Sequence, residues 1–135
     1  MALPNGAGGY QLGDGNRNEV RLGYANAPQT ATSTATLTAA QITGGMLVAN
    51  PSTSAATYTL PTAADIDNAV SSATVGSTFD LAIVNTGTSS GAVTLAMGTG
   101  VTDGGNAAVA VAITSSAIFR FRKTGDAAWS VYKIG

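Results

Sequence analysis

The chain has 135 residues, a length that fits one domain with one hydrophobic core. Only 10% of the residues are charged and the net charge is −1, so no broad basic surface is expected for nucleic acid or anionic lipid. Cysteine and histidine are both absent, which excludes disulfides, Cys/His zinc sites and His-based triads.

No stretch approaches the roughly 18 apolar residues of a membrane helix, and no signal-peptide pattern begins the chain, so we expect a soluble protein without a membrane partner. Hydrophobic residues make up 44% of the chain, but many of them are Ala and Val, and only 6% are aromatic. The core is therefore expected to be thin, because each buried Ala contributes little apolar area. A thin core favours association with neighbouring copies.

Residues 1–30 are predicted to form an extended N-terminal arm. Its stretch "GYQLGDGNRNEVRLGY", residues 9–24, contains the turn signal "GDGN". Apolar side chains recur with the strand period of two in two short pieces, Tyr10–Leu12 and Val20–Tyr24. These side chains have no long strand of their own to pack against.

The stretches "TATSTATLTA", "GGMLVAN" and "AATYTLP" between residues 31 and 61 predict short strands, since they combine Thr, apolar runs and alternation. The stretch "PTAADIDNAV" predicts a short helix. Thr62 followed by Asp65 fits a helix N-terminus, and Ile66, Ala69 and Val70 fall on one helical face.

Further strands are predicted in "TFDLAIVN", "AVTLAM" and "AVAVAI", separated by the turn-rich stretches "TGTSSG" and "GTGVTDGGN". The last two strands, "SAIFRFRK" and "AWSVYKI", form the strongest predicted hairpin. Its alternation places Phe119 and Phe121 inside and Arg120 and Arg122 outside. Large residues on both faces of the final strand indicate either burial on two sides or contact with another copy.

The sequence thus predicts an all-β domain over residues 31–135. About seven or eight short strands occur at the intervals typical of an antiparallel sandwich or barrel, with one short helix among them. We find no internal repeat of fixed period.

Carboxylate motifs do not predict a metal or catalytic site. The stretch "DGNRNE", residues 14–19, imitates the first half of a calcium loop, but Glu19 stands where that loop needs Gly and Ala25 where it needs Glu. Asp65 and Asp67 do not face each other on a helix, so they are expected to serve as charges near its N-terminus.

The remaining motifs also favour structural interpretations. "SVYK", from Ser130 to Lys133, matches a nucleophile motif that needs a helix, whereas a strand sends the two side chains to opposite faces. "GTGVTDGGN" lacks both the phosphate-binding spacing and a following helix. The cluster of Arg120, Arg122, Tyr132 and Lys133 is too small on an acidic chain to predict nucleic-acid binding. We therefore expect no enzyme, no cofactor and no required metal.

Four segments together resemble small structural proteins of tailed bacteriophages that infect marine and cyanobacterial hosts. They are "GYQLGDGNRNEVRLG", "LVANPSTSAATYTLPTAADI", "FDLAIVNTGTSSGAVTLAMGTGV" and "FRFRKTGDAAWSVYKI", which span most of the chain. The resemblance implies a virion protein that acts as a capsid decoration (cement) protein on the head surface. It also implies the major capsid protein as partner and, by analogy of fold, a homotrimer.

This resemblance suggests that the arm's apolar side chains pack on another protein, because an extended segment can add to an exposed sheet. The arm could instead fold back onto its own domain. A tail or head-fibre module and a carbohydrate-binding β-sandwich are two competing hypotheses for the function. The predicted docking residues are Tyr10, Leu12, Arg17, Val20, Arg21, Leu22 and Tyr24.

Overall fold

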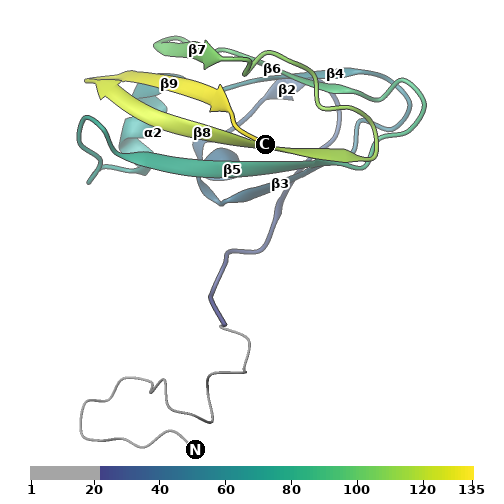
Figure 1. Cartoon of the computed structure of the whole chain (residues 1–135), viewed down its shortest axis with the longest axis horizontal. Coiled ribbons are helices and arrows are strands. Elements are labelled where there is room, and N and C mark those ends of the chain that lie inside the picture. The colour runs from purple at the N-terminus through teal and green to yellow at the C-terminus, as the bar shows by residue number, and fades with distance from the viewer. Residues whose placement is uncertain (1–21) are drawn as a thin grey trace, which may run out of the picture.

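The computed structural model describes residues 22–135, and this part of the chain is β-rich with two short helices (Figure 1). In chain order the elements are β1 (Gln29–Ala31), β2 (Ala35–Thr36), α1 (Ala39–Thr43), β3 (Met46–Ala49), β4 (Ala56–Thr59), α2 (Ala63–Ala69), β5 (Thr78–Asn85), β6 (Val93–Ala96), β7 (Val101–Gly105), β8 (Ser115–Gly125) and β9 (Ala128–Lys133).

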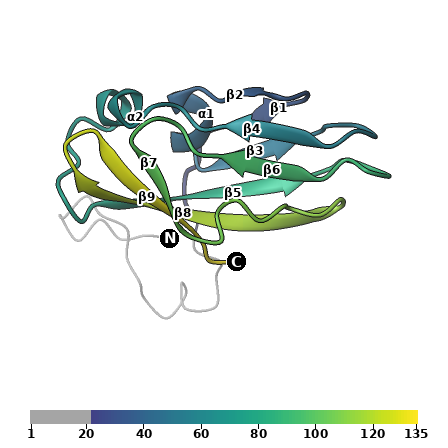
Figure 2. The same cartoon turned by 90° about the horizontal axis from the view of Figure 1, so that it is seen from above.

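The strands form two sheets. A six-stranded sheet has the order β1-β3-β5-β8-β9-β7, and a three-stranded sheet has the order β2-β4-β6. From β1 to β6 the chain alternates between the two sheets, so it winds through three successive turns of a coil. In Figure 2 the two helices lie next to each other along one border of the domain, where they connect the turns of the coil.

The expected antiparallel arrangement is wrong for most of the domain, because the sheets are mixed. β1, β3 and β5 are parallel neighbours, and so are β2, β4 and β6. Only β5–β8 and β8–β9 are antiparallel pairs of named strands. The coil explains the parallel pairs, since a chain that visits the other sheet before it returns enters its own sheet again in the same direction.

One hydrophobic core lies between the sheets. Buried side chains of the three-stranded sheet, such as Tyr58 and Leu95, belong to the same cluster as Leu47 and Ile83 of the six-stranded sheet. At the hairpin end of this core Phe79 stacks on Phe121, with ring centroids 4.7 Å apart. The edge of the Trp129 ring system meets Phe79 at 5.4 Å. Aromatic residues are few, but most of those in the described part are concentrated in this core.

The predicted helix is present as α2, and its N-cap is Thr62 as expected. The Thr62 hydroxyl accepts a hydrogen bond from the Asp65 backbone N–H and donates one to the Asp65 carboxylate. The expectation of a single helix is wrong, since α1 is a second one. It begins with a capping box of Thr38 and Gln41, a sequence signal that indicates a helix start even though the helix is only five residues long.

Two local predictions are wrong around residues 98–112. The stretch "AVAVAI" contains turns and one isolated bridge, Val93–Val111, instead of a strand. The carboxylate of Asp103 accepts backbone hydrogen bonds from Gly105, Ala107 and Ala108, which holds these amides in a turn. Conversely, the stretch expected to be a loop contains β7, which pairs in parallel with β9.

Asn85, at the end of β5, is one of only two polar or charged buried residues in the described part of the chain. Its side-chain amide donates to the carbonyl oxygens of Gly91, Val111 and Ala112, at 2.9–3.1 Å. Its Oδ1 accepts from the Gly87 N–H at 2.8 Å. One side chain thus ties the β5–β6 connection and the segment before β8 to the core.

The boundary expected after residue 30 falls inside β1, whose three residues already pair with β3. Residues 22–28 precede β1 without regular secondary structure and lead away from the two sheets (Figure 1). Neither described helix has the length and apolar character that a membrane crossing requires.

Candidate docking surface

The described end of the arm exposes its apolar side chains. Leu22 is 92% exposed and Tyr24 is fully exposed. Tyr24, Ala25 and Asn26 line a shallow depression together with Thr43–Gly45, at the end of α1. The other predicted docking residues, Tyr10, Leu12, Arg17, Val20 and Arg21, lie outside the described residues.

A second apolar surface lies on the outer face of the six-stranded sheet, which the three-stranded sheet does not cover. We call it the outer apolar band. Five members lie on β3, β5 and β8, where they alternate in sequence with core residues, and the sixth directly follows β9. They are Met46, Val48, Ala82, Val84, Ile118 and Ile134.

Register places the members of the outer apolar band side by side across the strands. Ala82 pairs with Met46 on one side and with Ile118 on the other. The Ile134 N–H donates to the Ile118 carbonyl at 2.8 Å, which sets Ile134 beside Ile118. Met46, Ile118 and Ile134 are 40%, 42% and 49% exposed, so three large apolar side chains of this row contact water.

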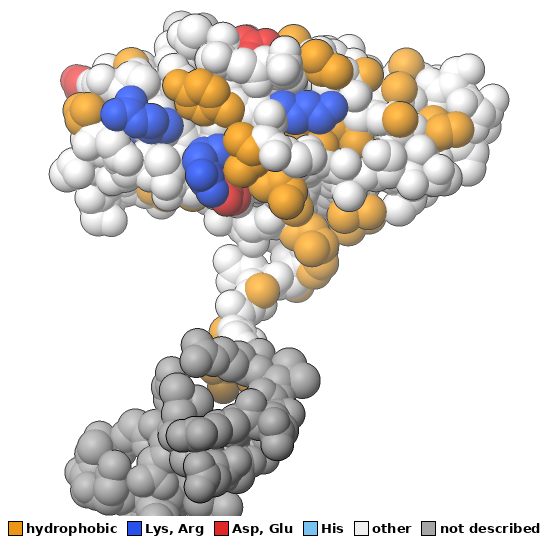
Figure 3. Space-filling model, viewed as in Figure 1, with side chains coloured by type: hydrophobic (Ala, Val, Ile, Leu, Met, Phe, Trp, Pro, Cys, Tyr) orange, Lys and Arg blue, Asp and Glu red, His pale blue; other side chains and the backbone are white. Residues whose placement is uncertain are grey.

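A polar border runs along one side of the outer apolar band. Arg120 donates two hydrogen bonds to the Asp80 carboxylate, from Nε at 2.8 Å and from Nη2 at 2.9 Å. This pairing lowers the pKa of Asp80 and raises that of Arg120. Tyr132 follows in register on β9, and Arg122 lies one pair further along. In Figure 3 hydrophobic side chains gather near the middle of this face, beside basic and acidic ones.

The sequence contained a signal for this surface that the strand prediction did not use. The same alternation that buries Phe119 and Phe121 turns Ile118 outward together with Arg120 and Arg122. An isoleucine on the arginine side of a strand indicates a partly apolar outer face. Met46 and Ala82 join it only through register between strands that are far apart in the sequence.

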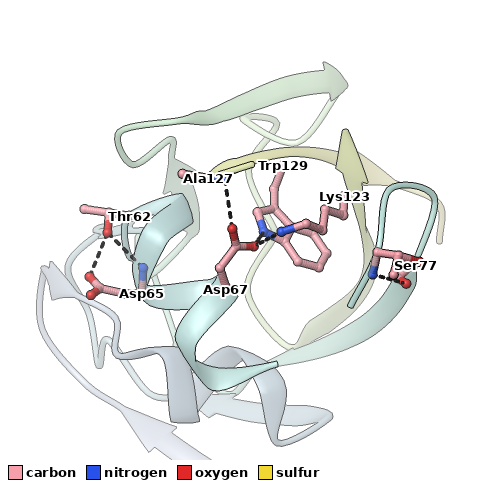
Figure 4. Close-up of polar contacts among 8 residues, drawn as sticks. Thr62, Asp65, Asp67, Ser77, Lys123, Ala127 and Trp129 are labelled. Atoms are coloured by element: carbon pink, nitrogen blue, oxygen red, sulfur yellow. Dashed lines mark hydrogen bonds and ion pairs between the residues drawn. The ribbon is translucent and has the colours of Figure 1, made fainter. Parts of the chain in front are cut away.

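Among the described residues, the strongest polar cluster lies around Asp67 and not on the outer face (Figure 4). One oxygen of the Asp67 carboxylate accepts hydrogen bonds from Lys123 Nζ and from Trp129 Nε1, and the other accepts from the Ala127 N–H. The hydrogen bond from Lys123, followed by that from Trp129, lowers the pKa of Asp67.

Asp67 joins α2 to the β8–β9 hairpin, whereas Asp65 bonds to Thr62, the N-cap of the same helix. The two carboxylates therefore serve separate structural roles, and the expectation that both act at the helix N-terminus holds only for Asp65. All polar side-chain atoms of the Asp67 cluster have partners, and Lys123 is almost completely buried. The cluster links α2 to the hairpin through hydrogen bonds to both carboxylate oxygens of Asp67.

The other sequence motifs occupy structural positions. Ser130 and Lys133 both lie on β9 at odd spacing, and Lys133 Nζ donates to the carbonyl of Ala110 at 3.2 Å. Asp103, within the Gly-rich stretch, has its pKa lowered by the backbone hydrogen bonds that it accepts, those from Ala107 and Ala108 above all. Among the residues that the structure describes, no acidic cluster has the grouping of a metal site.

A shallow groove crosses the ends of β2 and β4 near α2. It is lined by Thr36, Leu37, Thr38, Ala39, Thr59, Leu60, Pro61, Thr62, Asp65, Gly98 and Thr99. This lining offers hydroxyl groups but no aromatic ring on which a sugar could stack.

Comparison of the chain with protein-family models, with curated proteins and with solved structures gives no match.

Proposed function

We propose that this chain is a non-enzymatic virion structural protein that decorates the outer surface of a phage head. In this proposal its domain is a small β-sandwich, it assembles as a homotrimer, and it binds the major capsid protein. The observation that carries the proposal is the high exposure of Leu22 and Tyr24 on a stretch that leads away from the two sheets. The sequence resemblance to phage structural proteins supports the same function.

Docking through the arm follows from simple energetics. Large apolar side chains gain roughly 1.5–3 kcal/mol each when a partner buries them, and Leu22 and Tyr24 gain little of this while they are exposed. A capsid surface supplies both a partner for these side chains and backbone hydrogen bonds for an extended segment. Arg17 and Arg21 add pairing to acidic capsid residues, worth only about 0–1 kcal/mol at an interface rim.

The test is deletion of residues 1–26, followed by mixing with undecorated capsids and quantification of bound protein. We expect the truncated chain to keep its melting transition and its circular dichroism spectrum but to lose capsid binding. A full-length Gly23→Ala variant is the matched control, since nothing lies within 4 Å of a methyl group at this position. Binding of the truncated chain at the level of the full chain contradicts arm docking, and unfolding of the truncated chain shows that the arm belongs to the domain.

Copy number separates decoration from the fibre hypothesis. Decoration requires hundreds of copies on each particle, whereas a fibre module is present in few, so quantitative mass spectrometry of purified virions distinguishes them. Carbohydrate binding has the least support of the three hypotheses, because Tyr58 and Trp129 are buried and Tyr24 is the only fully exposed aromatic ring among the described residues. A glycan array with the full chain tests it directly.

A further inference from the structure

The outer apolar band is long and narrow, and its dimensions restrict what can cover it. It crosses β3, β5, β8 and the end of β9, and adjacent strands lie about 4.8 Å apart, so it is about 14 Å long. Along the strands it is two rows wide, the row of Met46, Ala82, Ile118 and Ile134 and the row of Val48 and Val84. Two rows on one face lie about 7 Å apart.

This surface suits one extended segment better than a second sheet. A band of these dimensions offers on the order of 200 Å², whereas a stable face-to-face interface buries about 800 Å² on each partner. The ion pair of Asp80 and Arg120 borders the apolar rows, so the apolar area does not extend further in that direction. An extended segment can cross the outer apolar band with its apolar side chains against the sheet. The opposite side of the segment then stays in contact with water.

The chain itself contains a segment of matching length and period. Val20, Leu22 and Tyr24 alternate in sequence, so an extended backbone presents all three on one side over about 13 Å. Arg21 and Gly23 then face away from the sheet. The segment also ends beside the band, because Tyr24 lines the same depression as Gly44 and Gly45, which directly precede Met46.

We propose that the outer apolar band binds the Val20–Tyr24 segment of a second copy of this chain. The segment does not cover the band of its own copy, since Leu22 is 92% exposed, Tyr24 is fully exposed, and residues 22–28 lead away from the sheets. Reciprocal exchange of such segments joins copies without a large flat interface. The proposed function assigns the same side chains to the capsid, so self-association is measured here on the protein alone, without capsids.

Disulfide trapping tests the proposed contact directly, because the chain contains no cysteine. Full-length Leu22→Cys and Ile118→Cys chains with different affinity tags are co-expressed and oxidised. We expect a mixed disulfide between the two tagged chains. The matched control pairs Leu22→Cys with Val75→Cys, because Val75 is 63% exposed but lies outside the band. Met46→Cys replaces Ile118→Cys if the latter variant does not fold.

The outcomes of the trapping experiment divide cleanly. Selective trapping at residue 118 or 46 supports the proposal. Equal trapping at residue 75, no trapping within the band, or an intramolecular disulfide in a dilute Leu22→Cys/Ile118→Cys double variant overturns it.

Sedimentation velocity supplies an independent measurement on full-length proteins. We expect Tyr24→Ser and Ile118→Ser each to weaken self-association by about tenfold or more, since each removes a large apolar side chain from the proposed interface. Val75→Ser is expected to change it by less than about twofold. A wild-type chain that is monomeric at micromolar concentration overturns the proposal, and so does unchanged association of both band and arm variants.

Discussion

Replacement of Asn85 by alanine is expected to be among the most destabilising single substitutions in this domain. The side chain is 1% exposed and makes four hydrogen bonds to backbone groups from two separate segments. Alanine removes all of them and leaves buried carbonyl groups without this donor. The loss affects the β5–β6 connection and the segment before β8 at the same time.

The expected magnitude follows from the number of hydrogen-bonding groups lost. The amide has two N–H bonds shared among three carbonyl oxygens, and its oxygen accepts from Gly87. At about 1 kcal/mol for each of three such groups, the free energy of unfolding falls by about 3 kcal/mol. For a domain of this size the melting temperature then falls by about 10–15 °C. Differential scanning calorimetry and urea titration of wild-type and variant chains measure both quantities.

Asn85→Asp provides the matched control for the donor role. It retains an oxygen that accepts from the Gly87 N–H. Where Asn85 has its N–H donors, however, it places a second carboxylate oxygen against the carbonyl oxygens. These oxygens and the burial raise the pKa of the new carboxyl in the folded state above its unfolded value of about 3.9. The protonated form therefore favours folding, and stability is lost as the pH rises through the folded-state pKa. We expect less destabilisation at pH 4 than at pH 7. A fall in melting temperature below about 3 °C for Asn85→Ala, or equal destabilisation of Asn85→Asp at both pH values, refutes this reasoning.

Three further substitutions test other parts of the fold. Asp67→Ala should free α2 from the hairpin and shift the fluorescence of Trp129. Because folding lowers the pKa of Asp67, this carboxylate contributes to the stability of the wild type above about pH 4, and the contribution is lost as the pH falls through the folded-state pKa. Acid titration of the wild-type and variant chains measures this loss. Thr62→Ala should lower the free energy of unfolding by about 1 kcal/mol in urea titration through loss of the N-cap, and a wild-type value would show that the cap contributes nothing. Gly98→Ala should cost about 1–3 kcal/mol because its methyl group meets the carbonyl oxygens of the 60–61 segment, whereas Gly23→Ala should leave the melting temperature unchanged.

Local alternation was sufficient to identify several elements from the sequence. The period of two correctly assigned the buried and outer residues of β8, and the β8–β9 hairpin is present as predicted. The start of α2 was also correct, because Thr62 provides a cap that depends only on residues three positions away. Such features are predictable because their determining contacts lie within one element or between neighbours in sequence.

The parallel coil was decided only by the tertiary structure. Gln29 and its partner Leu47 are 18 positions apart, Ala35 and Tyr58 are 23 apart, and Leu47 and Ile83 are 36 apart. The turns of the coil therefore have no common period that a sequence search could detect. The longer turn contains α2 and its following loop. Strand direction depends on where the chain goes between two strands, and alternation within a strand carries no information about that path.

The candidate docking surface was also predictable from the sequence only in part. The sequence by itself identified Leu22 and Tyr24 as alternating apolar residues, and their exposure in the folded chain agrees with a role outside the core. The outer apolar band depends on Met46, Ala82 and Ile118, which are up to 72 positions apart and become neighbours only through the register of β3, β5 and β8. Sequence alternation determines which side of a strand a residue faces, whereas only pairing between distant strands determines which other side chains share that side.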